Sequence, residues 1–428
     1  MSCAEAVAAV IEDAVVPGNM QPPSEMRTLF RSLRHRNFRL FWTGQLVSLV
    51  GTWMQSVAQA WLVLDLTGSP LKLGIVTALQ FLPILLLSFF TGPFIDFFPK
   101  RRIVIACQAA LMAQAFLLAL LDWTGTVQYW HVVVLATVLG VVNTIDMPAR
   151  QSFIIELVGR EDLMNAIGLN SSIFNAARAV GPALAGLLIA AADTSLCFLL
   201  NGFSFLAVIW SLGLMRVDET APRRTRPAGI FAGIGETLDA VRRTPPVLMT
   251  ILLVASVSIF AANFNVLVPV FARIELGRDA AAFGFLMSSF GFGALLGAIS
   301  LTYLSRLGPK PSFLIGSGLG LSCFLLLIGI QKSYGITAVL LGLCGWCIVA
   351  FFGTANTIVQ LNSEDHLRGR IMSIYTMAFG GLSPFGSMFA GVVSHWLGTS
   401  LTFALGGLVT LACFLAAAAA RRRSSPEG

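Results

Sequence analysis

The sequence predicts an all-α polytopic membrane protein with twelve transmembrane helices in two pseudo-symmetric six-helix bundles. Composition, recurring apolar segments and the distribution of basic residues support this fold class. Of the 428 residues, 56% are hydrophobic and only 11% are charged, whereas soluble domains carry about 25% charged residues. Apolar segments long enough to cross about 30 Å of hydrocarbon recur along the whole chain.

Twelve such segments are expected to span the membrane. They cover residues 40–64, 71–90, 103–121, 131–146, 165–192, 195–214, 247–271, 281–304, 313–330, 335–359, 371–397 and 401–420. Hydropathy collapses around a basic stretch bounded by prolines at 222 and 227, so the spans divide six and six. The expected parts are a cytoplasmic leader with a basic juxtamembrane segment (1–37), a first bundle (38–215), a cytoplasmic linker (216–246), a second bundle (247–420) and a cytoplasmic tail (421–428).

The basic residues predict the orientation of the spans. If the loops alternate between two sides, 23 of the 28 Lys and Arg lie on one side, four lie on the other, and Arg178 falls inside a span. Basic loops stay cytoplasmic, so we expect a protein of the bacterial inner membrane with both termini in the cytoplasm. The net charge of +7 is spread over short loops. The basic residues therefore set the orientation of the spans in the membrane, and we expect no nucleic-acid partner.

The first span carries a polar stripe. Gln45, Thr52, Gln55 and Gln59 follow one another at helical spacing. In lipid these side chains must face other helices or water. Two interpretations stay open: hydrogen bonds between helices, or one wall of a polar cavity.

The fifth span places a cation about halfway across the membrane. Asn175, Arg178 and Pro182 share a face, beside the small residues Gly181 and Gly186. A charge at that depth is by default a functional-site hypothesis. The alternative is a structural arginine that is paired or that caps carbonyl groups. The Gly181-Pro182 pair also predicts a helix kink, because proline removes a backbone hydrogen bond.

The turn between the second and third spans predicts a gate. Asp96 has no inexpensive place in lipid, since an unpaired carboxylate at membrane depth costs several kcal/mol. Asp146, at about the same depth, is an expected partner for Arg101 or Arg102. The alternative is a solvated turn with topogenic charges. The candidate gating residues are Gly92, Asp96, Lys100, Arg101, Arg102, Asp146 and Arg150.

The two halves of the chain echo each other. Gly92 and Gly297 are 205 residues apart, and each ends its half's second span just before a basic turn. The position that matches Asp96 is Leu301. This pattern favours a duplicated six-span unit in which one copy keeps the acid.

Several chemistries find no support in the sequence. Six of the seven cysteines lie in spans, and the four histidines have no ligand spacing between them. The phosphate-binding pattern GxxxxGK[ST] is absent, which argues against an ATP-driven pump. We therefore expect no catalytic residues, no metal and no cofactor, and we expect that the protein is not an enzyme. A membrane-embedded enzyme is kept only as a remote alternative.

These features resemble the major facilitator superfamily. The pattern from Gly92 through Asp96 to Lys100–Arg102 resembles its loop motif, although Phe97 stands where a basic residue is usual and Pro99 replaces a second glycine. Gly181, Pro182 and Gly186 look like the fifth-helix motif of its antiporters. Segments 34–41, 65–70 and 146–151 resemble the enterobactin-exporter-like branch of bacterial efflux proteins.

The resemblance implies alternating access around a central cavity that helices one, four, seven and ten face. Its implied activity is secondary active transport, with proton-coupled efflux of a small amphipathic molecule, drug-like or siderophore. The candidate cavity residues are Gln45, Thr52, Gln55, Gln59, Asn143, Asn175, Arg178, Asn263, Asn265, Asn356 and Tyr375.

Energy coupling needs an acid that titrates in the cavity. Our candidates are Asp146, or Asp65 in an outward vestibule. In the outward-open form Asp96 is expected to meet the N-terminal end of the eleventh helix, at residues 370–373. The expected partners are a small-molecule substrate, protons and membrane lipids, for a monomeric protein. A lipid or lysolipid flippase, a uniporter and a sensor without transport remain alternatives on the same fold.

Overall fold

A computed structural model describes residues 30–216, 234–304, 311–364 and 367–424 of the chain. Within α4, the side chains of residues 89, 90, 92, 93 and 96 are outside the described part. Over the described ranges the chain is helical, and twelve helical segments are long and apolar enough to span a membrane. These twelve segments confirm the predicted fold class.

The first bundle begins with the short helix η1 (Arg31–Arg34). Its six spans are α3 (Arg36–Thr67), α4 (Pro70–Phe97), α5 (Lys100–Trp123), α6 (Tyr129–Val158), α7 (Leu163–Ala191) and α8 (Thr194–Gly213). Local signals set the tight turns. Gly68 ends α3 in the left-handed region with φ of 59°, Ser69 caps α4, and Pro70 occupies its first turn.

The second bundle follows helix α9 (Ile234–Arg243), which lies in the region predicted as linker. Its first span runs over Pro245–Glu275 and is divided into α10 (Pro245–Ser256), η2 (Val257–Ala261), α11 (Phe264–Val270) and η3 (Phe271–Glu275). The remaining helices are α12 (Ala280–Leu304), α13 (Pro311–Ile330), α14 (Tyr334–Leu361), α15 (Arg368–Thr376), η5 (Met377–Gly381), α16 (Ser383–Leu397) and α17 (Thr399–Ser424).

Helix α6 is longer than predicted. The sequence placed its end near Asp146, where the hydropathy falls, but the helix continues through Pro148 to Val158. The length of an apolar segment matches the thickness of the hydrocarbon core and does not mark where the hydrogen-bonded helix ends. The prediction therefore missed the last, more polar turns of α6. This extension positions Arg150 on the same helix as Asp146.

The packing inside the bundles is repeated. In the first bundle α4 packs on α6 and α5 packs on both α6 and α8; in the second, α12 packs on α14 and α13 on both α14 and α17. Between the bundles, α4 meets α16 and α7 meets α12. The second and fifth spans of one bundle thus contact the fifth and second of the other, as a pseudo-two-fold relation requires.

Glycines allow the two bundles to touch closely. A Cβ on Gly74 of α4 would lie 2.8 Å from the Cα of Gly391 on α16. On the other side of the molecule, a Cβ on Gly186 of α7 would lie 2.7 Å from the carbonyl oxygen of Ala280. Such backbone contacts are typical of helix packing in membranes, where small residues let helices approach.

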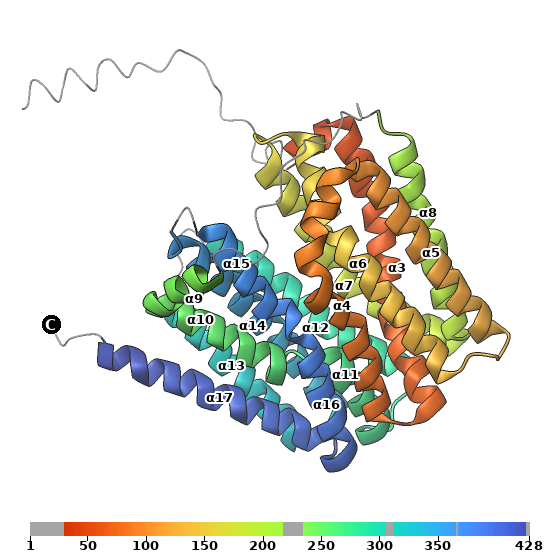
Figure 1. The fold of residues 1–428 in the computed structure, drawn as a ribbon. Coiled ribbons are helices and arrows are strands. Elements are labelled where there is room, and N and C mark those ends of the chain that lie inside the picture. Colours follow the sequence, from red (N-terminus) through yellow and green to blue (C-terminus); the bar gives the residue numbers. More distant parts are fainter. Residues whose placement is uncertain (1–29, 217–233, 305–310, 365–366, 425–428) are drawn as a thin grey trace, which may run out of the picture.

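These contacts lie at one end of the molecule. We call the end that carries η1 and the α4–α5 and α6–α7 turns the basic end, and the other the opposite end. Gly74 and Gly391 belong to the halves of α4 and α16 nearer the opposite end. In Figure 1 the bundles meet at the lower right, around α11 and α16, and diverge toward the ends where α9 and α15 lie. The close approach of α4 to α16 therefore lies nearer the opposite end.

Gly291 offers a test of this interface. Its Cβ would lie 2.8 Å from the Cα of Ala179, so Gly291→Leu cannot fit without separating α12 from α7. We expect a cost of about 1–3 kcal/mol or more from overpacking, seen as a lower midpoint of thermal unfolding in detergent. The control is Gly316→Leu, because nothing lies within 4 Å of a Cβ there. Equal midpoints for the two variants would contradict the interface.

Candidate functional site

A cavity of about 320 Å³ lies mainly within the first bundle, and we call it the polar cavity. Amide and hydroxyl side chains form much of its wall, with aromatic rings between them. The amides and hydroxyls are Gln45, Thr52, Gln55, Ser56, Gln59, Gln80, Asn143, Gln151, Asn170 and Asn201. Asn265 of α11 completes the lining from the second bundle, and the charged members are Asp146 and Arg150.

A second cavity of about 410 Å³ lies between the bundles, and we call it the basic-end cleft. Helices α4 and α6 line one side, and α15 and η5 line the other. It shares Asn143, Met147 and Gln151 with the polar cavity. The two spaces are therefore adjacent, which makes the cleft a route from the basic end to the polar cavity.

Asp146 is the centre of a buried charged cluster. It is 1% exposed and forms an ion pair with Arg150, four residues on along α6. Gln108 of α5 donates to its other oxygen at 3.2 Å, and Arg150 also donates to Gln45 of α3. The cluster joins three helices around one carboxylate.

This cluster leaves polar atoms unpaired. The Nε2 of Gln45, the Oε1 of Gln108 and the Nε of Arg150 are buried and have no hydrogen-bond partner within the described residues. An unpaired buried polar group costs about 1–3 kcal/mol. Such a cluster is suited to rearrangement, since another arrangement or a bound molecule can supply the missing partners.

A neutral amide network lies beside the cluster. Gln55 donates to Gln114 at 2.9 Å and accepts from Asn201 at 2.6 Å, and Ser204 donates to Asn201 at 2.9 Å. Gln59 donates to Gln80 at 2.9 Å. The polar stripe of the first span therefore combines both interpretations, because Gln55 and Gln59 bond other helices and also line the cavity.

Arg178 lies between the two bundles. Its guanidinium carbon is 5.4 Å from the ring centre of Trp53 on α3 and 4.6 Å from that of Phe290 on α12. Its Nε is buried without a hydrogen-bond partner within the described residues. Each cation–π contact contributes about 0.5–2 kcal/mol, whereas an arginine at the membrane centre costs at least about 2.5–3.5 kcal/mol.

Pro182 and Gly186 lie where α7 contacts α12 of the second bundle, whereas a Cβ on Gly181 would meet Trp53 and the carbonyl oxygen of Val50 on α3. Helix α7 runs without interruption through Pro182. Proline has no N–H, so the carbonyl of Arg178, four residues before it, has no donor in the helix ladder. Gly291 of α12 packs directly against that carbonyl. The structure thus places Pro182 and Gly186 of this motif in the interface between the bundles.

The opposite end carries an ion pair between the bundles. Arg273 of η3 donates to Asp65 of α3 at 2.8 Å. The Arg273 guanidinium lies 5.1 Å from the ring centre of Trp61, and Trp61 stacks on Phe283 of α12 at 6.0 Å. These contacts hold the bundles together at the end where their glycines meet.

At the basic end, two of the predicted gating residues, Lys100 and Arg101, bind within the first bundle. Lys100 pairs with Glu156 of α6, and Arg101 donates to the carbonyl oxygens of Leu212 at 2.9 Å and Gly213 at 3.3 Å. The predicted pairing of Asp146 with Arg101 or Arg102 is wrong, because Asp146 bonds Arg150 and Gln108. Residues four apart on one helix are direct neighbours, so Arg150 lies closer to Asp146 than an arginine on another helix at a similar depth in the membrane. Gly92 and Asp96 lie in α4, and their side chains are outside the described part.

Of the five predicted cavity residues that line neither cavity, Arg178 is described above and the other four form hydrogen bonds within the protein. Asn175 and Asn263 donate to carbonyls of their own spans, at 2.9 Å and 2.7 Å. Asn356 accepts from Gln360 at 2.6 Å, and the buried Tyr375 donates to the carbonyl of Phe352 at 3.0 Å. In this conformation their polar atoms support local structure. Of the other predicted residues, Gln45, Thr52, Gln55, Gln59, Asn143 and Asn265 line the polar cavity.

Sequence reasoning missed several members of the site. Gln80, Gln108, Gln114 and Asn201 are isolated amides within apolar spans. A usable signal existed, since an amide inside a membrane span must find a partner. The aromatic members Trp53, Phe81 and Phe174 gave no signal, because apolar spans are rich in such residues.

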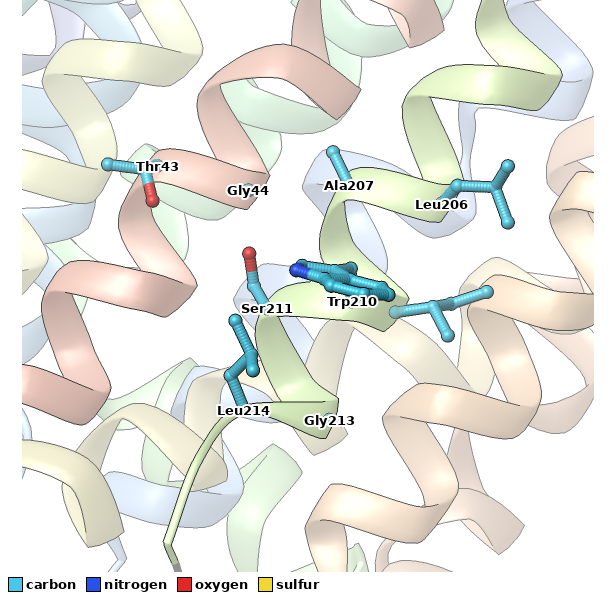
Figure 2. Close-up of a pocket in the computed structure, with 9 residues that line it drawn as sticks. Thr43, Gly44, Leu206, Ala207, Trp210, Ser211, Gly213 and Leu214 are labelled. Carbon is cyan, nitrogen blue, oxygen red and sulfur yellow. The ribbon is translucent and has the colours of Figure 1, made fainter.

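A larger pocket of about 750 Å³ lies on the outer side of the first bundle. Figure 2 shows Thr43 and Gly44 of α3, Trp210 and Ser211 of α8, and Leu214 just after α8 around it. Trp210 is 73% exposed, as expected of a surface that faces lipid. No charged residue lines this pocket, so it is not a candidate for the site.

Two six-helix bundles around a polar, charged cavity define a membrane transporter of the major facilitator type. The family model described as transmembrane secretion effector matches residues 27–427. The chain therefore belongs to this family of the major facilitator superfamily, and it is a multi-pass membrane protein.

Transporters are also found among its relatives. The chain is 25% identical over 387 residues to the staphyloferrin A transporter of Staphylococcus aureus, covering 87% of this chain and 93% of that protein. It is 26% identical to the multidrug efflux pump Tap of Mycolicibacterium fortuitum, covering 82% and 88%. It is 20% identical to macrolide efflux protein A of Streptococcus pyogenes, covering 87% and 93%.

Solved structures share the fold. A peptide transporter of the POT type superposes with a TM-score of 0.75 at 11% identity, covering 91% of this chain and 94% of that chain. A bacterial homologue of the human lysosomal transporter Spinster, in an inward-facing and unoccupied conformation, gives a TM-score of 0.67 at 14% identity, covering 94% and 96%. These similarities concern the fold alone.

Proposed function

We propose that the protein exports a small amphipathic molecule in exchange for protons, by alternating access, and that it is not an enzyme. The observation that carries the proposal is a polar cavity with a buried carboxylate, reached through a cleft between two bundles. Relatives at 25% and 26% identity are, by name, a staphyloferrin A transporter and a multidrug efflux pump. These relatives favour export over the uniporter and flippase alternatives.

The orientation follows from the charges. We propose that the basic end and both termini lie on the cytoplasmic side of the inner membrane, because 23 of the 28 basic residues lie on that side. The structure is then the inward-open form, closed on the outside by Asp65–Arg273. Alternation must break these contacts and close the basic-end cleft, as a two-state equilibrium biased by substrate and protons.

Asp146 is our candidate for the proton carrier. It is the only acid among the residues that line the polar cavity, whereas Asp65 is bound in the ion pair at the opposite end. Protonation neutralises the carboxylate and removes its attraction for Arg150. The freed guanidinium and amides then rearrange, which couples the proton to the shape of the cavity.

A charge-neutral double variant tests this role. Asp146→Asn alone leaves Arg150 buried without a counter-ion, and breaking a buried pair costs about 3–5 kcal/mol. Asp146→Asn with Arg150→Gln removes both charges and keeps hydrogen-bonding amides. In proteoliposomes we expect the double variant to lose substrate accumulation driven by a pH gradient, while exchange of substrate for substrate continues.

The matched control is Glu156→Gln, an exposed acid on the same helix that pairs with Lys100. It should keep gradient-driven accumulation. Full gradient-driven transport by the double variant would move the proton carrier to another residue. The substrate panel for wild type is a carboxylate siderophore, a macrolide, ethidium and a lysophospholipid, ranked first by thermal shift of the purified protein.

Asp96 remains our candidate for the cytoplasmic latch in the outward-open form, against the N-terminal end of α15 (Arg368–Thr376). We expect Asp96→Asn to abolish efflux from cells and to leave the amount of protein in the membrane unchanged, because the isosteric amide removes only the charge. Efflux at the wild-type rate would remove the latch from this account.

A further inference from the structure

The charges near the polar cavity do not balance. Asp146 and Arg150 neutralise each other, and Asp146 is the only acid that lines the cavity. Arg178 adds a second cation close by. Within the described residues no carboxylate lies within ion-pair distance of it, and its guanidinium contacts the faces of two aromatic rings. The region thus carries an excess positive charge.

The surroundings of Arg178 do not explain it as a structural residue. A structural arginine in a membrane span caps backbone carbonyls or pairs with an acid. Here no carbonyl accepts from its guanidinium within the described residues, and its Nε is buried without a partner. Aromatic faces attract a cation but carry no counter-charge. An anion is the missing component.

Arg178 also lies next to the cavity wall. Phe174 and Asn170, one and two turns earlier on α7, line the polar cavity, as does its aromatic partner Trp53. Trp53 and Phe174 pack edge to face with ring centres 5.7 Å apart. A molecule in the cavity thus meets two aromatic rings, set at an angle to each other, beside a cation, which suits an acidic group on an aromatic or apolar body.

The position of Arg178 links this cation to alternation. Phe290, its second aromatic partner, belongs to α12 of the other bundle. Opening the opposite end must separate α7 from α12 and take Phe290 away from the guanidinium. A bound anion can replace that contact, so it would stabilise the cation while the interface changes.

We propose that Arg178 recognises the charged group of the substrate and that the transported molecule is an organic anion with an aromatic or apolar body. This inference rests on the proposed transport function and narrows its substrate class. It favours acidic molecules over cationic drugs. A carboxylate, catecholate or similar acidic group shares the required chemistry.

The test uses three fluorescent probes in proteoliposomes: coumarin-3-carboxylate, its neutral analogue coumarin-3-carboxamide, and the cation ethidium. We expect wild type to transport the carboxylate about tenfold faster than the carboxamide, since a tenfold preference corresponds to about 1.4 kcal/mol. Arg178→Gln should reduce carboxylate transport to the carboxamide rate and leave carboxamide transport unchanged. Arg178→Lys should restore part of the preference. Arg160→Gln, which removes an exposed cation at the basic end, should keep it.

Each other result overturns the proposal. Arg178→Gln that still prefers the carboxylate shows that another group recognises the charge. Equal loss of all probes, with a lower unfolding midpoint, shows a structural arginine. If wild type transports ethidium or the carboxamide without preferring the carboxylate, the proposed transport function holds and the proposal of an anionic substrate is wrong. Wild type that moves no probe and no member of the substrate panel contradicts the proposed function as well.

Discussion

The structure depends on one constraint, which is that hydrocarbon offers no hydrogen-bond partner and no counter-ion. Every polar group in a span must then find its partner inside the protein or in water. The amides of α3, α4, α5 and α8 bond one another, and the one cavity-lining carboxylate bonds an arginine and a glutamine. Where the partners run out, around Arg178 and the buried atoms of Gln45 and Gln108, the molecule has capacity to bind something else.

The two bundles share an architecture but not a chemistry. The polar cavity is built almost wholly by the first bundle, and Asn265 is the second bundle's contribution to its lining. The second bundle supplies the surfaces against which the first one moves, through Gly291 and Gly391. Its divided spans, with the π-helical segments η2, η3 and η5, lie in the helices that contact the first bundle at the closed end and line the cleft. The two bundles thus repeat one packing arrangement, and the charged cavity belongs mainly to the first.

Much of the fold was predictable because the membrane imposes a local rule. Twelve apolar segments could be read one at a time, and the basic loops checked their number independently. The ends of helices were less predictable: Pro148 and the polar residues after Asp146 suggested a stop, yet α6 continues to Val158. Composition within a window does not show whether a helix extends beyond the bilayer.

The site was predicted in part, for a related reason. The polar stripe from Gln45 to Gln59 was visible in the sequence, because its spacing defines one face of one helix. The partners of that face were not, because the choice between Gln114 and Asn201 depends on how α5 and α8 rotate against α3. Asn263 and Tyr375 show the reverse error: these polar residues were expected to line the cavity, but they bond their own backbone or a neighbouring span.

Alternating access is the central claim, and it is measured most directly by spin-label distances at both ends of the molecule. Labels at Met164 and Leu361 report the basic end, and labels at Trp123 and Ile330 report the opposite end; all four positions are at least 66% exposed. The account predicts that adding a transported substrate, or changing the pH, shortens the first distance and lengthens the second together. Distances that stay fixed at both ends, or that change in the same direction, would contradict it.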